Sequence, residues 1–214
     1  RSVDSSSSRL ASWLIGSISH SFVLIIPACG LLWKVTGRES TSLRYTGLMR
    51  EIILIAHDIR STHNVGSLLR TAECLGVQHV YFTGYTPYPS AEQDERLPHI
   101  AAKLTRQIEK TSLGTEKLVP WTHAPDIFAL LTALKSDGFM LTALEQNPAS
   151  IPLPRLKPPE KIALLIGREV EGIAPELLEK CDVTVEIPQF GRKESLNVAQ
   201  ATAIALYNCR VGTS

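Results

Sequence analysis

Residues 162–172 read IALLIGREVEG, an apolar run that stops at one glycine and meets a second glycine five positions later. Consecutive apolar residues over this length are typical of a strand that is buried on both faces of a sheet. Gly167 and Gly172 bound a turn that needs a permissive backbone, and a helix is expected soon after it, at Pro175–Lys180. This stretch predicts a β-strand ending in a glycine-bounded loop, and such loops at the carboxyl ends of parallel strands are where open α/β folds bind ligands.

The same alternation of strands and helices extends over most of the chain. Further strands are expected at Ile52–Ala56, Val80–Thr83, Lys117–Trp121, Phe139–Leu144 and Val183–Ile187, and helices at about 64–75, Ile100–Lys110, Ile127–Leu134 and Leu196–Cys209. Asn64 is the expected N-cap of the first helix, and Gly76 is its expected C-terminal stop. The pattern predicts an α/β fold whose mostly parallel sheet is flanked by helices.

The first 48 residues differ from the rest of the chain. The 21-residue stretch Trp13–Trp33 contains no Lys, Arg, Asp or Glu and is long enough to span a bilayer, although a proline and a glycine interrupt it. Met49 resembles a natural cytosolic start that opens directly on a buried strand. We expect residues 1–48 to be an extension that is disordered or outside the native domain, and 49–214 to be the catalytic domain. A membrane segment is the less favoured alternative.

Composition excludes several classes of protein. With 44% hydrophobic and 20% charged residues the chain can bury a core, and it is not a disordered chain by composition. The formal net charge of +1 gives no global sign of nucleic-acid binding, so any grip on RNA must come from a local patch. Four scattered cysteines without a CxxC pair favour reduced thiols in a cytoplasmic protein over a disulfide scaffold or a zinc site.

Three polar clusters hold the candidate chemistry. They read NVGSLLRTA at residues 64–72, IGREVEG at 166–172 and IPQFGRKESLNVA at 187–199. Taken singly, each has a structural explanation, because Asn and Ser cap helices, an arginine on a helix is often solvated and glycines form turns. The chain lacks the GxGxxG fingerprint of dinucleotide-dependent oxidoreductases and the GxxxxGK[ST] loop of nucleotide triphosphatases.

In this order, NxGxxxR, GxExxG and IP…SLNV resemble the SpoU/TrmH branch of the SPOUT RNA methyltransferases, over Ile52–Cys209. The resemblance implies a fold with a C-terminal trefoil knot, S-adenosylmethionine bound in the knotted loops, and a homodimer. It also implies methyl transfer to a ribose 2′-hydroxyl of tRNA or rRNA, without a metal. A catalytically inactive RNA-binding relative is the alternative, although all five polar motif positions are present.

The resemblance also assigns roles to residues. The implied catalytic positions are Asn64, Arg70, Glu169, Ser195 and Asn197. The implied cofactor-binding positions are Leu144, Ile166, Gly167, Glu169, Gly172, Ile187, Leu196 and Asn197. Because a guanidinium stays protonated, with a pKa above ~12, we expect Arg70 to clamp the neighbouring phosphate and stabilise the developing alkoxide rather than act as a base. The last helix is apolar nearly all round, which favours a dimer interface over the core of a monomer.

Overall fold

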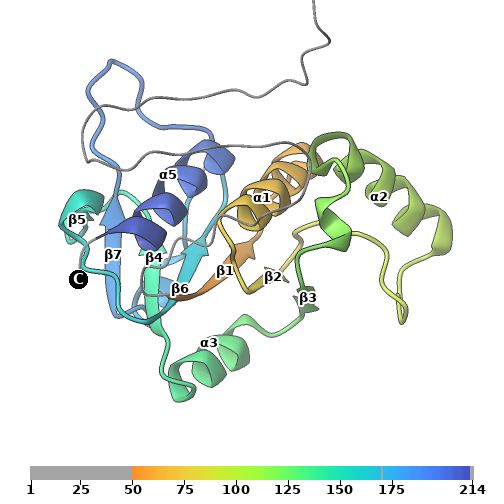
Figure 1. The fold of residues 1–214 in the computed structure, drawn as a ribbon, viewed down its shortest axis with the longest axis horizontal. Helices are drawn as coiled ribbons and strands as arrows, with labels where there is room; N and C mark the ends of the chain where they lie inside the picture. The colour runs from red at the N-terminus through yellow and green to blue at the C-terminus, as the bar shows by residue number, and fades with distance from the viewer. Residues whose placement is uncertain (1–49, 170, 213–214) are drawn as a thin grey trace, which may run out of the picture. The chain divides into compact units, whose positions relative to one another are not determined.

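The computed structural model describes residues 50–169 and 171–212, and within them seven parallel strands form one sheet (Figure 1). The strands are β1 (Glu51–His57), β2 (His79–Thr83), β3 (Trp121–Ala124), β4 (Met140–Leu144), β5 (Ile151–Pro152), β6 (Lys161–Ile166) and β7 (Val183–Glu186). Their order across the sheet is β3-β2-β1-β6-β4-β7-β5. All the pairings between neighbouring strands are parallel, which confirms the predicted α/β class.

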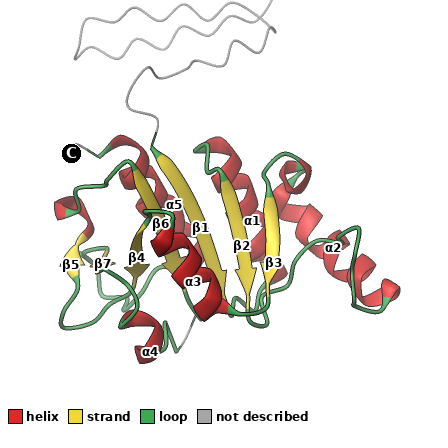
Figure 2. Ribbon diagram, turned by 90° about the horizontal axis from the view of Figure 1, so that it is seen from below, coloured by secondary structure: helices red, strands yellow, loops and turns green. Residues whose placement is uncertain are grey.

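Helices cover both faces of the sheet. They are α1 (Thr62–Cys74), α2 (Pro98–Ser112), α3 (Ile127–Ser136), α4 (Pro175–Leu178) and α5 (Val198–Val211), with 3-10 turns at Thr115–Lys117 and Leu153–Arg155. Figure 2 shows α3 on one face of the sheet and α1 and α5 on the other. The strands that both layers cover are therefore hidden from water on both sides, as their apolar runs predicted.

The side chains of β1 show how one strand serves both layers. Ile52 and Leu54 join the core beneath α1 and α5, whereas Ile53 and Ile55 join the core beneath α3 and α4. The same alternation in β6, the neighbour of β1, sends its side chains to both cores. Since these two strands lie at the centre of the sheet, they fix the frame on which the loops at its carboxyl edge are built.

Two local predictions were wrong. The strand expected at Lys117–Trp121 begins only at Trp121, because the chain forms a 3-10 turn at Thr115–Lys117, and the N–H groups of Leu118 and Val119 donate to the Thr115 carbonyl oxygen at 3.0 and 3.1 Å. The N-cap of α1 is Ser61, whose hydroxyl accepts from the Asn64 N–H at 3.3 Å, and not Asn64. The Asn64 side chain is thereby free for long-range contacts. Gly76 follows the helix with a φ of +64°, as expected for its stop.

Two arginines tie the ends of the described domain together. The Arg50 guanidinium donates to the carbonyl oxygens of Pro158 at 3.1 Å and Gly212 at 2.7 Å. The Arg210 guanidinium donates to the carbonyl oxygens of Arg50 at 2.8 Å and Leu75 at 2.9 Å. These bonds hold the start of β1, the end of α1 and the end of α5 in one place.

The candidate membrane segment Trp13–Trp33 and the extension 1–48 lie outside the described residues. Among residues 50–169 and 171–212, none of the helices combines the length and apolarity that crossing a bilayer requires. The C-terminal knot stays a prediction of the resemblance.

Candidate functional site

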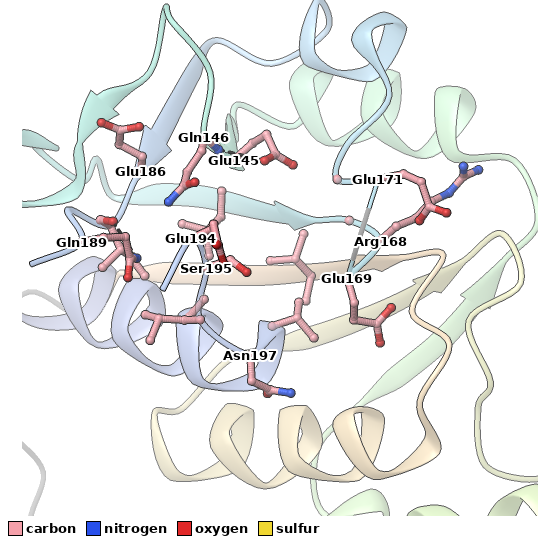
Figure 3. A pocket seen from close by; sticks show the side chains of 18 residues that line it. Glu145, Gln146, Arg168, Glu169, Glu171, Glu186, Gln189, Glu194, Ser195 and Asn197 are labelled. Atoms are coloured by element: carbon pink, nitrogen blue, oxygen red, sulfur yellow. Dashed lines mark hydrogen bonds between the residues drawn. The ribbon is translucent and has the colours of Figure 1, made fainter. Parts of the chain in front are cut away.

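A cavity of about 550 Å³ opens at the carboxyl edge of the sheet, where β4, β6 and β7 end. Its volume lies within the range of small-molecule sites. The wall contains every position that the resemblance assigned to a cofactor, namely Leu144, Ile166, Gly167, Glu169, Gly172, Ile187, Leu196 and Asn197, together with Ser195. Figure 3 shows Glu145, Gln146, Glu169 and Asn197 around this space, contributed by different loops. The structure thus brings together residues from the second and third clusters.

The loop from Gly167 to Gly172 needs glycine at both ends. A Cβ atom on Gly167 would lie 2.6 Å from Ile173 Cγ1 and 2.9 Å from the Gly172 carbonyl oxygen. Gly172 has a φ of +72°, and a Cβ there would collide with the carboxylate of Glu145. That carboxylate accepts a hydrogen bond from the Ile173 N–H at 2.8 Å. Neighbouring protein atoms therefore fill the space that a side chain would need at either glycine, and the two ends of the loop pack tightly.

A chain of side-chain hydrogen bonds joins all three clusters. Asn197 caps α5 by accepting from the Ala199 N–H at 3.0 Å, and its Nδ2 donates to Asn64 Oδ1 at 3.2 Å. Asn64 Nδ2 in turn donates to Glu169 Oε1 at 3.1 Å. The Arg60 N–H donates to the other carboxylate oxygen of Glu169 at 3.4 Å. These bonds hold two amides and a carboxylate in a defined orientation at the cavity rim. A ligand hydroxyl could therefore bind to them without rearranging the side chains.

The lining is strongly acidic. Alongside Arg168 it carries the carboxylates Glu145, Glu169, Glu171, Glu186 and Glu194. Such a wall favours a ligand that carries positive charge. The sequence analysis missed all of these acids except Glu169. A signal was present, because Glu145 directly follows a predicted strand and Glu186 lies at the end of another, at the sheet edge where ligands bind.

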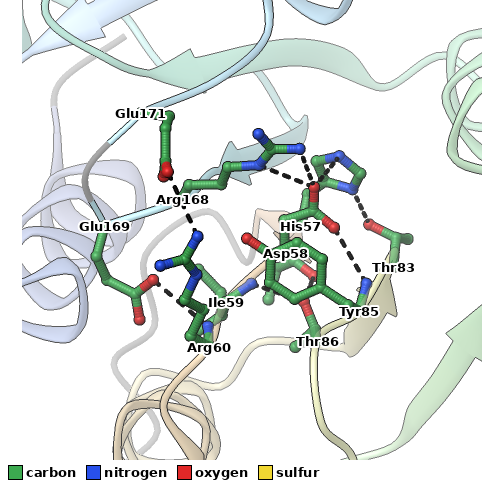
Figure 4. A network of polar contacts seen from close by, with 11 residues as sticks. His57, Asp58, Ile59, Arg60, Thr83, Tyr85, Thr86, Arg168, Glu169 and Glu171 are labelled. Carbon is green, nitrogen blue, oxygen red and sulfur yellow. Dashed lines mark hydrogen bonds and ion pairs between the residues drawn. The ribbon is translucent and has the colours of Figure 1, made fainter.

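A second polar network, also missed, braces the far side of the glycine loop (Figure 4). Arg168 donates to Asp58 Oδ2 from Nε at 3.1 Å and from Nη2 at 2.9 Å, and the Tyr85 N–H donates to Asp58 Oδ1 at 3.0 Å. The hydrogen bond to Asp58 raises the pKa of Arg168 above its ordinary value. Burial lowers the pKa of His57 and outweighs the opposing pull of the Asp58 carboxylate. His57 ends β1 and Asp58 follows it directly, which is the signal that pointed to them.

Arg70 lies apart from the cavity. It is exposed on α1 and is not among the lining residues. It lies six positions after Asn64, which corresponds to about 9 Å along a helix axis. Its predicted role at the substrate phosphate stays a prediction, and so do the roles of the other motif residues. Among the described residues, there is no group of three or more side chains suited to hold a metal ion.

Comparison with known proteins identifies relatives of this chain. The sequence model of the SpoU rRNA Methylase family matches residues 51–207. A tRNA (guanosine(18)-2'-O)-methyltransferase of Aquifex aeolicus is 26% identical over 161 residues, which are 75% of this chain and 69% of that protein. A Staphylococcus aureus protein named for the TrmH family of tRNA/rRNA methyltransferases is 29% identical over 155 residues, 72% of this chain and 56% of that one. The chain thus spans little more than half the length of the staphylococcal relative.

Solved structures agree on the fold. The A. aeolicus TrmH/SpoU tRNA modifying enzyme superposes with a TM-score of 0.62 at 24% identity, over 76% of this chain and 77% of that chain. An AdoMet-bound rRNA methyltransferase from Sinorhizobium meliloti gives a TM-score of 0.61 at 24% identity, over 75% of this chain and 56% of that chain. The α/β arrangement described above is therefore one that known RNA methyltransferases share.

Proposed function

The chain belongs to the SpoU rRNA methylase family, and from that premise we propose that it transfers the methyl group of S-adenosylmethionine to a ribose 2′-hydroxyl of tRNA or rRNA. The observation that carries the proposal is the hydrogen-bonded chain Asn197–Asn64–Glu169, which joins the three motifs at the rim of one cavity. The names of the relatives, which include tRNA 2′-O-methyltransferases, support the same reaction.

The residues of the cavity fit S-adenosylmethionine. Leu144, Ile187 and Leu196 supply apolar surface against which the flat adenine ring would pack. The carboxylates of the wall suit the positive charges of its sulfonium and ammonium groups. When bound, the cofactor supplies an activated methyl group.

The protein contributes position and electrostatics. Glu169 is held by Asn64 and by the Arg60 N–H, so its carboxylate is fixed where a ribose hydroxyl at the rim would donate to it. Asn197 is fixed by the start of α5, which ties the rim to the loop that also lines the cavity. Arg70 is assigned to the phosphate next to the reacting ribose, and its charge stabilises the alkoxide that develops as the 2′-hydroxyl loses its proton.

The family resemblance and one apolar stripe support a homodimer. On α5, Ile204, Tyr207 and Val211 are exposed by 45%, 59% and 43%, and their spacing places them on one side of the helix. A second copy of the chain would cover this stripe. We assign residues 49–214 to the catalytic domain, because every motif lies within them. The cytoplasmic location stays a prediction.

Tritiated-methyl transfer from S-adenosylmethionine tests the proposal, with bulk tRNA and rRNA from a strain that lacks the gene as acceptors. Glu169→Gln should lower the rate by about tenfold or more, because the donors Asn64 and Arg60 meet different carboxylate oxygens, one of which becomes an NH2 group that cannot accept, and the negative charge is lost. Glu176→Gln, an exposed residue of α4 outside the cavity, should match the wild type. Absence of transfer by the wild type to any of these RNAs would overturn the proposal.

A further inference from the structure

A second cavity, of about 650 Å³, lies beside the first one. It is formed by the loops that follow β1 and β2, by β3 and by α2, and its lining includes Arg60, Tyr85, Tyr88, Arg96 and His123. Like the first cavity, it lies at the carboxyl edge of the sheet, where α/β folds bind ligands. Its aromatic lining contrasts with the acidic wall of the first cavity, so the two cavities suit different partners.

The outer wall of this cavity is built rigidly. Arg96 donates to both carboxylate oxygens of Asp94, at 2.8 and 2.5 Å, and to the carbonyl oxygens of Tyr88 at 2.9 Å and Pro89 at 3.0 Å. Its guanidinium lies 3.5 Å from the centre of the Tyr88 ring, and the His123 ring stacks on Tyr88 at 4.3 Å. The bonds from Arg96 lower the pKa of Asp94, so this ion pair persists at neutral pH. The wall is therefore preformed, and its arginine is already neutralised.

Tyr85 presents an available aromatic surface to the same cavity. It is 48% exposed, whereas its backbone is fixed because its N–H donates to Asp58 at 3.0 Å. The next residue, Thr86, is buried, donates from its hydroxyl to the Ala56 carbonyl oxygen at 3.0 Å and accepts from the Ile59 N–H at 3.0 Å. An exposed ring on an anchored backbone can stack on a flat ligand without a large loss of conformational entropy.

The two cavities share a wall. Arg60 belongs to the second cavity, but its N–H bonds Glu169 at 3.4 Å and its guanidinium pairs with Glu171 at 3.4 Å, and both acids line the first cavity. Arg168 lines the first cavity and lies 5.8 Å from the centre of the Tyr85 ring (Figure 4). If the ribose of a nucleotide binds beside Glu169 at the rim of the first cavity, the base of the same nucleotide can therefore reach the second cavity.

We propose that the second cavity binds the base of the methylated nucleotide, which leaves the RNA strand and stacks on Tyr85 while Arg60 contacts the neighbouring phosphate. The inference rests on the proposed RNA methyl transfer and adds where the substrate is held. Proteins recognise single-stranded RNA by stacking unpaired bases on aromatic side chains and arginines, which is the chemistry this cavity offers. The proposal explains why the loop after β2 is braced so firmly although it contributes nothing to the first cavity.

The test uses the full chain and fluorescein-labelled 12-nucleotide oligoribonucleotides, oligo(A), oligo(C), oligo(U) and one mixed sequence, with binding followed by anisotropy. Tyr85→Ala should weaken binding of at least one of them by about fivefold or more, the range expected when one stacked base is lost. Tyr85→Phe keeps the ring and removes only the hydroxyl, which contacts the Arg60 side chain, so it should retain most of the binding that Tyr85→Ala loses. Phe128→Ala removes an aromatic residue of similar exposure, 45%, from α3 and should change nothing. Affinity for S-adenosylmethionine, measured by calorimetry, should stay the same in all variants and serves as the check on folding.

Three outcomes would overturn the assignment: equal RNA binding by wild type and Tyr85→Ala, no RNA binding by the wild type, or binding of nucleoside 5′-monophosphates without binding of any oligonucleotide. Failure of the proposed function looks different. A wild type that binds RNA through Tyr85 but transfers no methyl group would retain the base site and refute the enzymatic activity.

Discussion

Replacing Gly167 with alanine tests the glycine loop, on which the cofactor site depends. The added Cβ would lie 2.6 Å from Ile173 Cγ1 and 2.9 Å from the Gly172 carbonyl oxygen, and one of these contacts is backbone that cannot rotate away. Overpacking of this kind costs about 1–3 kcal/mol. For a domain of this size such a cost lowers the melting temperature by about 2–12 °C. If the strain is relieved by opening the loop, affinity for S-adenosylmethionine falls by about 5- to 150-fold.

Thermal unfolding and calorimetric titration with S-adenosylmethionine measure both effects. Gly191→Ala is the matched control, because Gly191 lies on the loop before α5 and a Cβ there would meet no atom within 4 Å. That variant should stay within about 0.5 kcal/mol of the wild type in stability and should bind the cofactor normally. Unchanged melting and unchanged titration for Gly167→Ala would refute the idea that the tight loop shapes the site.

Three further predictions concern catalysis, assembly and domain limits. Arg70→Ala should leave the affinity for S-adenosylmethionine nearly unchanged, because Arg70 lies outside the cavity. The same substitution should lower the rate of methyl transfer by about 10²-fold, and Arg70→Lys should recover little of that rate. Near-normal methyl transfer by Arg70→Ala would remove its catalytic role. Light scattering should give twice the mass of one chain for the wild type. Ile204→Glu places a charge on the exposed stripe of α5 and should give the mass of a monomer. A monomeric wild type would contradict the dimer. A fragment beginning at Met49 should fold and bind S-adenosylmethionine in calorimetry like the full chain, and an insoluble or non-binding fragment would show that residues 1–48 are structural.

The sequence predicted those features that depend on local chemistry. The apolar runs of β1 and β6 identified buried strands, and Gly167 and Gly172 marked a loop at the edge of the sheet. The motifs, read through the family resemblance, selected positions that the structure gathers in the wall of the first cavity, because the fold delivers strand ends to a common edge.

What the sequence did not predict depends on long-range contacts. Ser61 and Asn64 are both good capping residues, so residue type alone could not decide that Ser61 caps α1 while Asn64 reaches Glu169, 105 positions away. The insertion of β6 between β1 and β4 is likewise a tertiary result that periodicity does not encode. The second cavity gave no periodic signal, because its wall is a loop braced by Arg96.

Identification of the methylated nucleoside would show whether the protein methylates a ribose. RNA from a strain lacking the gene is treated with the purified protein and deuterated-methyl S-adenosylmethionine, digested to nucleosides and analysed by mass spectrometry. We expect one nucleoside that carries the heavy methyl group on its ribose, with fragmentation leaving the base unlabelled. A heavy methyl group on a base, or an unlabelled RNA after incubation with active, cofactor-bound protein, would contradict it.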